Sequence, residues 1–420
     1  AWRRMDNPAR TTILPPMKHD TDIAIVGGGL NGPALALALA QAGFSVTVID
    51  SLSETVRKTA TFDGRAYALA LASTRLLRAI GIWDRVQDHA QPMLDIKVSD
   101  GRAGEGPSPF FLHFDHAEIE EGPMGHMLED RFLRRAFLDA MKDDARITRI
   151  RDTVTAQDVT PTGATLTFAS GKTLSAQLIV GSDGRASGTA RRAGIRRTGW
   201  GYGQTALVAA IEHDLPHNGT AHQFFMPPGP LAILPLPGNV SSIVWSENDE
   251  TAAQFAALPD EDFMAVLRPR FGDFLGDIRL RGKRFTYPLN LTIANSFVAD
   301  RVALIGDAAH GMHPIAGQGL NAGLRDVGAL AQVLDEARHR GEDIAAPDVL
   351  ARYQQWRRFD TATLALVTDA TNRLFSNDNP LLRLGRDIGM GVLGKMPRLR
   401  RGFIREAAGL TGDLPALMKG

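Results

Sequence analysis

The chain has 420 residues, of which 44% are hydrophobic, so it exceeds what one hydrophobic core usually holds and predicts two intimately joined domains. Its 47 basic and 47 acidic side chains give a formal net charge of zero, and no overall field therefore favours nucleic acid. The lack of cysteine excludes disulfides, thiolate nucleophiles, iron–sulfur clusters and cysteine zinc sites.

The first 20 residues combine arginines with prolines and lack the apolar core of a signal peptide. We therefore expect residues 1–20 to form a disordered extension. No stretch of about 18 apolar residues is free of interrupting glycine, so we do not expect a helix that spans a membrane.

Residues 22–50 have the pattern of a mononucleotide-binding βαβ unit. An apolar strand is followed by Gly27, Gly29 and Gly32 in the spacing G-x-G-x-x-G, then by a helix. The first glycine allows a tight turn, the second lets backbone amides approach a pyrophosphate, and the third permits close packing of helix and strand. A second strand ends at Asp50, where an acid can accept a hydrogen bond from an adenosine ribose. The unit predicts a dinucleotide site without distinguishing FAD from a nicotinamide dinucleotide.

Two later apolar strands end in turns that pair glycine with aspartate. The strand at residues 178–181 precedes Asp183 and Gly184, and a later strand precedes Gly306 and Asp307. A carboxylate at the tip of a buried strand suits hydrogen bonding to a sugar or ribityl hydroxyl, because the strand is fixed and the tip is open. An ordinary turn of an α/β protein is the alternative.

After the second of these turns, the chain leads through a proline into a helix that opens with glycine. The residues concerned are Pro314, Gly317, Gln318, Gly319, Leu320 and Asn321. Unpaired backbone amides at a helix start carry partial positive charge, and glycines let a ligand reach them. This helix start would stabilise a flat ring that gains negative charge on reduction.

The three motifs together resemble those of the group A flavoprotein monooxygenases, which carry G-x-G-x-x-G, DG and GD in this order. The resemblance extends over nearly the whole chain from Asp22 onward. Within that group, residues 313–326, HPIAGQGLNAGLRD, are similar to the signature of the ubiquinone-biosynthesis hydroxylases. Residues 62–73, 206–225 and 229–245 point to the same family.

We expect an α/β fold with a Rossmann-like FAD-binding domain of the aromatic hydroxylase type, an interleaved β-sheet substrate domain and a C-terminal helical segment. The substrate sheet is indicated by alternating apolar and polar residues with glycine and proline turns at 95–125 and 205–288. The expected limits are 21–80, 126–198 and 291–375 for the FAD-binding domain, 81–125 and 199–290 for the substrate domain, and 376–420 for the helical region.

The resemblance also implies roles for individual residues. The ADP half of FAD would be bound by Gly27, Gly29, Gly32 and Asp50. Arg65 would lie near the pyrophosphate and the incoming nicotinamide cofactor, and Asp183 with Gly184 would stand at the junction of both cofactors. Gly306 and Asp307 would hold the ribityl or pyrophosphate region, and Pro314 and Gly317 to Asn321 would face the isoalloxazine. Glu129 is a candidate for a contact on the adenine side, with a solvated helix end as the equal alternative.

The implied function is FAD-dependent hydroxylation of the aromatic ring of a polyprenylated phenol in ubiquinone biosynthesis. NAD(P)H would be the reductant and dioxygen the co-substrate, through a flavin C4a-hydroperoxide, with no side chain assigned to catalysis. Two alternatives stay open. One is a related flavoenzyme, such as an epoxidase or a reductase of isoprenoid double bonds, and the other is a non-catalytic, FAD-bound assembly subunit.

Several conspicuous side chains have simpler explanations than catalysis. His310 and His313 have metal-like spacing, but no third ligand is evident, so we expect no metal and interpret both as turn and packing residues. Trp245 is expected in the core or in a pocket wall. A further group could line the substrate cavity or equally belong to the sheet core: Phe224, Phe225, Leu234 and Pro235.

The tail combines apolar residues with the basic cluster Lys395, Arg398, Arg400, Arg401 and Arg405. We expect a packed C-terminal helix with a solvated cationic face, and contact with anionic lipid is the alternative. We expect the protein to be cytoplasmic. Because a polyprenylated substrate would have to be taken from a bilayer, peripheral contact with the inner membrane face is a further hypothesis. Membership of a ubiquinone-biosynthesis protein complex is another.

Overall fold

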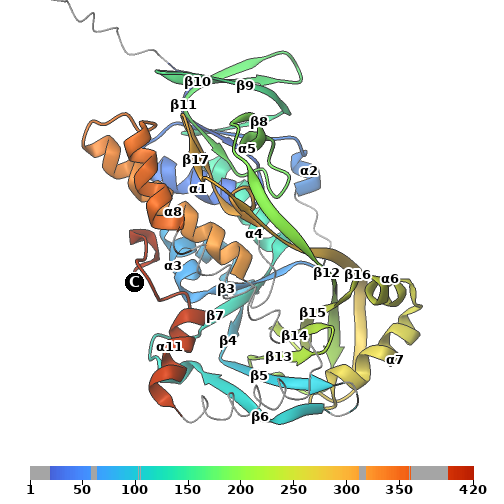
Figure 1. Ribbon diagram of the computed structural model, residues 1–420. Helices are drawn as coiled ribbons and strands as arrows, with labels where there is room; N and C mark the ends of the chain where they lie inside the picture. The colour runs from blue at the N-terminus through green and yellow to red at the C-terminus, as the bar shows by residue number, and fades with distance from the viewer. Residues whose placement is uncertain are drawn as a thin grey trace, which may run out of the picture.

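The computed structural model describes residues 19–57, 64–102, 104, 106–311, 318–358, 360 and 396–420. Within these residues the chain forms three sheets flanked by helices (Figure 1). The α/β fold with a C-terminal helix that we predict from the sequence is confirmed. The limits of the two domains stay a prediction, and residues 1–18 of the expected N-terminal extension lie outside the described part.

The first sheet has a parallel centre with the strand order β17-β18-β11-β1-β2-β8, and β10 and β9 extend from β11 as an antiparallel hairpin. Its strands are β1 (Thr21–Val26), β2 (Val46–Asp50), β8 (Ile147–Arg151), β9 (Val154–Thr160), β10 (Gly163–Phe168), β11 (Thr173–Gly181), β17 (Val298–Ala299) and β18 (Val302–Leu304). The central strands are almost wholly buried, as expected of a parallel sheet that is covered by helices.

Helices cover this sheet and meet each other closely. α1 (Asn31–Gln41) is buried along nearly its whole length, because it contacts both α4 (Asp130–Asp143) and α8 (Gln318–His339). Its alternation of alanine and leucine suits this position, since the alanines allow close approach while the leucines fill the space between elements. The βαβ unit and the helix that follows Gly306 and Asp307 are both confirmed. Shorter helices are α2 (Glu54–Arg57), α3 (Leu71–Ala79) and α5 (Gly188–Arg192).

The second sheet has eight strands in the order β19-β16-β12-β15-β14-β13-β5-β6. Its strands are β5 (Asp95–Arg102), β6 (Gly106–Asp115), β12 (Arg197–His213), β13 (Thr220–Met226), β14 (Gly229–Leu236), β15 (Val240–Asn248), β16 (Ile278–Ala294) and β19 (His310–Gly311). A third, small sheet joins β3 (Ala66–Ala70), β7 (Gly125–Glu129) and β4 (Gln91–Met93).

The two faces of the second sheet pack against different layers. On the outer face, Leu207 and Trp245 belong to a core with Phe263 of α7 (Asp260–Phe271). On the inner face, Val208 packs with Phe285, and a Cβ at Gly64 would lie 2.3 Å from the Phe285 ring. The inner face is turned toward β3 and α8, because Ala210 packs with Ala68 of β3 and Leu291 packs with Ala322 of α8.

The expectation of sheet throughout residues 205–288 is wrong between β15 and β16. This stretch contains two helices, α6 (Asp249–Ala257) and α7 (Asp260–Phe271), which cover the outer face (Figure 1). Asn248 caps α6 by accepting a hydrogen bond from Thr251 N at 2.8 Å, and both helices carry acidic residues in the first turn. A capping side chain and acidic residues stabilise a helix start. In this stretch they indicate the helices better than the pattern of apolar residues does.

α11 (Pro397–Ala407) packs on the end of β6. Its Ile404 is fully buried, and Arg400 and Arg405 donate to Glu118 and Glu121. The predicted packed C-terminal helix is thus present, whereas Lys395 lies outside the described residues. Among the helices that the structure describes, none combines the length and apolar character needed to cross a membrane.

Candidate cofactor site

Three of the predicted motifs meet at one edge of the first sheet. β1, β11 and β18 are parallel neighbours, so their carboxyl ends lie together. Ser182 N donates to Val26 O at 2.8 Å, and Ile305 N donates to Gly181 O at 3.0 Å. Parallel α/β sheets bind ligands at such an edge. We call the three segments the glycine loop (residues 27–32), the DG turn (residues 183–184) and the GD turn (residues 306–307).

The glycine loop uses glycine for two different purposes. A Cβ at Gly27, where φ is +119°, would lie 2.2 Å from Ser182 O, and one at Gly32 would lie 2.1 Å from Gly27 O. Close packing therefore requires both glycines. A Cβ at Gly29, in contrast, would have none of the described atoms within 4 Å, so this position is open to a ligand.

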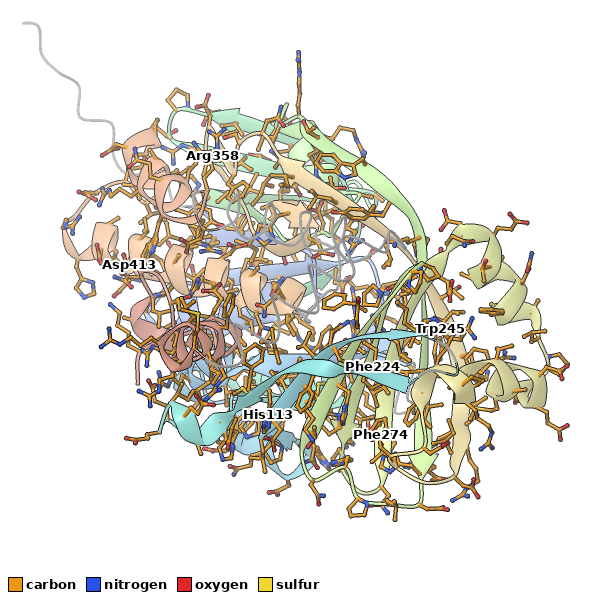
Figure 2. The ribbon with its side chains drawn as sticks, turned by 60° about the horizontal axis from the view of Figure 1, so that its bottom comes forward. His113, Phe224, Trp245, Phe274, Arg358 and Asp413 are labelled. Carbon is orange, nitrogen blue, oxygen red and sulfur yellow. The ribbon has the colours of Figure 1, made fainter. Side chains whose placement is uncertain are left out.

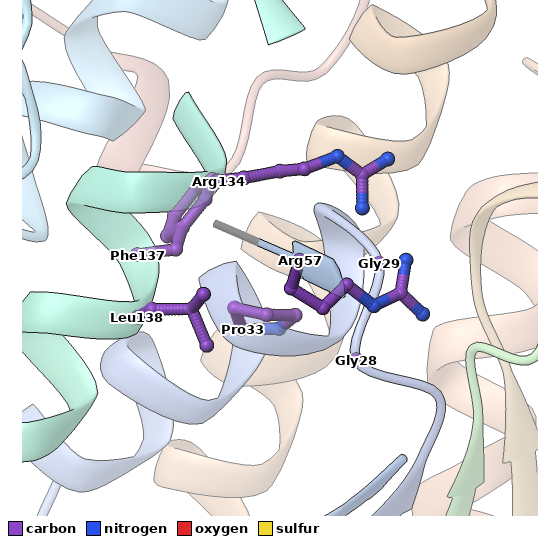
Figure 3. A pocket seen from close by; sticks show the side chains of 7 residues that line it. All are labelled: Gly28, Gly29, Pro33, Arg57, Arg134, Phe137 and Leu138. Atoms are coloured by element: carbon purple, nitrogen blue, oxygen red, sulfur yellow. The ribbon is translucent and has the colours of Figure 1, made fainter. Parts of the chain in front are cut away.

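Asp50 lies beside the glycine loop, because a Cβ at Gly28 would be 2.3 Å from its Oδ2. Its carboxylate is paired with Arg57 of α2, whose Nε donates to Oδ2 at 2.7 Å and whose Nη2 donates to Oδ1 at 3.0 Å. No sequence motif indicates Arg57. A small pocket at this place, shown in Figure 3, is lined by Gly28, Gly29, Pro33, Arg57, Arg134, Phe137 and Leu138.

Arg65 and Glu129 lie at neighbouring ends of β3 and β7, which pair with each other. Arg65 contacts Asp130, the first residue of α4, with Nη2 3.5 Å from Oδ2. The Glu129 carboxylate accepts a hydrogen bond from Arg131 Nε at 2.6 Å, and its side chain is only 14% exposed. Glu129 is therefore an ion-paired residue rather than a solvated helix end, and its contact with adenine stays a prediction.

The Asp183 side chain is engaged within its own turn. It accepts hydrogen bonds from Ser187 Oγ and, at 2.9 Å each, from the backbone N and the Oγ1 of Thr189. These bonds fix the turn to the start of α5. The carboxylate thereby shapes the DG turn, and its contact with either cofactor stays a prediction.

Two arginines connect the DG turn with the GD turn. Arg185 Nε donates to Asp307 Oδ2 at 3.2 Å, and Arg185 Nη1 donates to Asn290 Oδ1 of β16 at 2.8 Å. Arg197, the first residue of β12, donates to the carbonyl oxygens of Arg185 and Asp307. The Asp307 side chain remains 42% exposed, so it is accessible to a ligand. Nothing in the sequence indicates these two connections.

A fully buried carboxylate, Asp326, forms a hydrogen bond with the GD turn from the interior of the protein. It accepts hydrogen bonds from Gly306 N at 2.8 Å, His310 Nε2 at 2.6 Å and Arg357 Nε at 2.7 Å. Burial opposes ionisation, but the charges of His310 and Arg357 hold the pKa of Asp326 below its usual value. His310 is thus a partner of a buried acid, which goes beyond the packing role expected from the sequence.

The start of α8 is tied to β3 by Asn321. Its Oδ1 accepts from Ala70 N at 2.9 Å and from Ser73 Oγ at 2.8 Å, while its Nδ2 donates to Ala68 O at 2.8 Å. The side chain therefore holds the helix start in place. Gln318, Gly319 and Leu320 belong to the same first turn. Pro314, Gly317 and His313 lie outside the described residues.

The arrangement fits a flavin dinucleotide. Like Gly29, Gly184 and Gly319 would place a Cβ where no described atom lies within 4 Å. Asn31 Oδ1, at the start of α1, is buried without a hydrogen-bond partner among the described atoms. Open glycines on three segments, two helix starts and nearby arginines are what a diphosphate with a reducible ring requires.

The aromatic residues singled out in the sequence belong to the second sheet. Trp245 is fully buried in the outer core beside Phe255 and Phe263, which confirms the core interpretation. Phe224 lies in the same core, near Phe274, as Figure 2 shows. Of the other three candidates for the cavity lining, Phe225 and Pro235 are buried. Leu234 is partly buried and packs toward β3 and β7.

Comparison with known proteins gives matches over nearly the whole chain. Residues 20–365 match the family model described as FAD binding domain. Ubiquinone hydroxylase UbiL of Rhodospirillum rubrum is 47% identical over 405 residues, which cover 95% of this chain and 92% of that protein. The 3-demethoxyubiquinol 3-hydroxylase of Escherichia coli is 34% identical over 394 residues, covering 93% of this chain and 99% of that protein.

A solved structure shares the fold. The crystal structure of p-nitrophenol 4-monooxygenase PnpA from Pseudomonas putida superposes with a TM-score of 0.76 and covers 94% of this chain and 99% of that one. Its sequence identity is 21%, so this likeness concerns the fold alone.

Proposed function

The chain belongs to the FAD-binding family of flavoprotein monooxygenases that includes the ubiquinone hydroxylases, and from this premise we propose that it hydroxylates the ring of a polyprenylated phenol. NAD(P)H would be the reductant and dioxygen the second substrate. The observation that carries the proposal is the meeting of the glycine loop, the DG turn and the GD turn at one sheet edge, opposite the apolar inner face of the second sheet.

FAD, when bound, supplies the redox chemistry, and the chain supplies binding, orientation and shielding from water. In this proposal the ADP half lies against the glycine loop, with Asp50 toward the ribose and Arg65 toward the diphosphate. Asp307 reaches the ribityl region from the GD turn. The start of α8 directs its backbone amides toward the ring, where partial positive charge stabilises a reduced anion.

The substrate is proposed to lie against the inner face of the second sheet. Val208, Leu289 and Phe285 on this face are apolar and pack together. A wall of this kind binds an aromatic ring with a hydrocarbon tail and keeps water from the reacting atoms. None of the described residues on this face is needed as a nucleophile, because the ring to be hydroxylated is already electron-rich.

For the membrane, we propose that α11 rests on anionic lipid at the inner face. Met396, Leu399 and Phe403 are each close to half exposed, at positions three and four residues apart on one side of the helix. Arg398 and Arg401 are exposed beside them. Flotation with anionic vesicles should be weakened by Leu399→Asp, whereas the variant Asp273→Asn, outside α11, should float like the parent. Equal flotation of both variants would contradict the proposal.

The function is tested by mass spectrometry of quinone intermediates in cells that lack the protein. We expect one under-hydroxylated prenylphenol to accumulate, and complementation under oxygen-18 gas should place label in its product. Complementation with Asp307→Ala should fail through loss of FAD, whereas Asp335→Ala, which alters a half-exposed carboxylate on α8, should succeed.

Other outcomes separate the competing hypotheses. A labelled epoxide, or a saturated isoprenoid chain without label, would indicate the related flavoenzymes. Restoration of the quinone by a variant that binds FAD but does not oxidise NAD(P)H would indicate an assembly subunit. A normal quinone profile in cells without the protein would overturn the assignment to ubiquinone.

A further inference from the structure

One buried carboxylate contacts both arginines that approach the cofactor site from β3 and α4. The side chain of Asp130 is only 3% exposed. Its Oδ2 accepts a hydrogen bond from Arg134 Nε and lies 3.5 Å from Arg65 Nη2, and its Oδ1 accepts a hydrogen bond from the Tyr67 hydroxyl at 2.9 Å. A single carboxylate thus links Tyr67 of β3, Arg134 of α4 and Arg65, which immediately precedes β3.

The backbone fixes Asp130 firmly in this position. Its N–H donates to Arg65 O at 2.9 Å, which extends the pairing of β3 with β7 by one step. As the first residue of α4, its carboxylate also interacts favourably with the positive end of the helix dipole. Burial, followed by the charge of Asp130, raises the pKa of Tyr67 well above its usual range, so the phenol stays a donor at all working pH values.

The cationic groups of this cluster lie on the side of the cofactor site. Both guanidinium groups contact the one carboxylate of Asp130. Arg134 lines the pocket beside Gly28 and Gly29, as Figure 3 shows, and the Arg65 side chain is 39% exposed. Asp130 itself is covered by its partners. Arg65 is therefore the more accessible cation, whereas Arg134 is 11% exposed at the pocket wall, and the same carboxylate contacts both.

We propose that Asp130 is a positioning residue that orients Arg65 and Arg134 toward the diphosphate groups of FAD and of the incoming nicotinamide cofactor. A guanidinium held at one end by a buried carboxylate loses little side-chain entropy when it binds a phosphate. The part that concerns the nicotinamide cofactor rests on the proposed function. The part that concerns FAD stands on binding alone.

A double-mutant cycle on FAD binding tests the first part. The dissociation constant of FAD is measured for the parent, Asp130→Asn, Arg134→Ala and the double variant, each as apoprotein. We expect each single change to weaken binding about tenfold, and the double variant to bind clearly better than the product of the two losses predicts, because part of the effect of Asp130 passes through Arg134 and the rest through Arg65. Losses that simply multiply would overturn the proposal, since Asp130 would then act independently.

A second variant guards against a general loss of structure. Tyr67→Phe removes one donor to Asp130 without changing any charge. FAD binding should weaken by only about threefold, with circular dichroism unchanged, because the ion pairs remain. A loss of FAD in Tyr67→Phe as large as in Asp130→Asn would show that the cluster acts through packing, which would also overturn the proposal.

Flavin reduction tests the second part. With FAD supplied in excess, Asp130→Asn should raise KM for NAD(P)H about tenfold and change kcat less than twofold, because only the diphosphate contact is disordered. The matched control is Asp143→Asn at the other end of α4, which removes an exposed pair with Arg85 and should alter neither constant. An unchanged KM with lowered kcat would contradict the role. If even the parent protein did not oxidise NAD(P)H, the proposed function would be wrong. The double-mutant cycle would still test the role of Asp130 in FAD binding.

Discussion

Two regions of the molecule are built in opposite ways. One is the sheet edge at which β1, β11 and β18 end, and the other is the inner face of the second sheet. At the strand ends, backbone atoms approach within distances that leave no room for a Cβ, as between Gly27 and Ser182. On the inner face, alternate side chains such as Val208 pack with Phe285, while their neighbours, such as Leu207, point to the outer core. In our proposal the first region offers amides to the cofactor, and the second offers apolar side chains to the substrate.

This contrast implies that the two regions respond differently to substitution. Parallel strands bring loops that are distant in sequence to one edge, where position matters more than side-chain volume. An antiparallel sheet presents side chains with period two, so its surface can change without moving the backbone. Changes at the strand ends should therefore alter stability and cofactor binding, and changes on the inner face should alter substrate binding.

The largest effect is expected at Asp326, which supports the first region. Asp326→Asn removes the buried carboxylate that pairs with Arg357 and His310 and leaves Arg357 with only the more exposed Asp360, and breaking a buried pair in this way costs about 3–5 kcal/mol. Denaturant unfolding of the apoprotein measures the loss. A change below about 1 kcal/mol, typical of an exposed ion pair, would show that the network does not stabilise the GD turn.

A pair of glycine substitutions should divide stability from cofactor binding within the glycine loop. Gly27→Ala must fit a Cβ 2.2 Å from Ser182 O at a φ of +119°, so it should destabilise even the apoprotein by a few kcal/mol, on the order of known backbone strain and overpacking. Gly29→Ala meets open space, so it should leave the apoprotein as stable as the parent while weakening FAD binding. Calorimetry of both apoproteins and flavin titration distinguish the two. Equal stability of the two variants would contradict the division of roles.

Acid should lower the free energy of unfolding through two partly buried histidines, one in the third, small sheet and one in the second sheet. Burial, assisted by Arg78, lowers the pKa of His126 in β7 from 6.5 to about 4, and burial, assisted by Lys97, lowers the pKa of His222 in β13 to about 4. Below pH 6.5 the unfolded chain binds these protons while the folded chain does not, so the free energy of unfolding falls as the pH falls toward 4. For each histidine, the loss amounts to about 1.4 kcal/mol for every pH unit in this interval.

Replacing one histidine at a time shows whether both histidines contribute. His222→Phe and His126→Phe should each make the unfolding free energy depend less on pH in this range, as followed by urea unfolding. If neither variant reduced the dependence, the two imidazoles would not be responsible for it.

The sequence predicts the first region well and the second poorly, for physical reasons. The glycine spacing, the acid at Asp50 and the DG and GD turns are local patterns, because backbone geometry demands glycine at fixed offsets. Arg197 bonds to Asp307 O across 110 positions, and no local pattern marks such a contact. The same holds for Asp326 and Arg357. Helices α6 and α7 also escape prediction, since their apolar residues are spaced ambiguously and only the cap of α6 and the acidic first turns of both helices indicate them.

The smallest effect should come from one strand of the second sheet, where adjacent residues face opposite layers. Val208→Leu adds one carbon to the inner face, and Leu207→Val removes one from the outer core. We expect Val208→Leu to raise KM for the prenylphenol about fivefold without altering flavin reduction, because a single methylene in a pocket is worth about 1 kcal/mol or slightly more. Leu207→Val should lower stability by about 1 kcal/mol and leave KM unchanged. An equal change of KM in Leu207→Val and Val208→Leu would contradict the proposed difference between the two regions. Substrate binding would then depend on the position of the whole sheet and not on the side chains of its inner face.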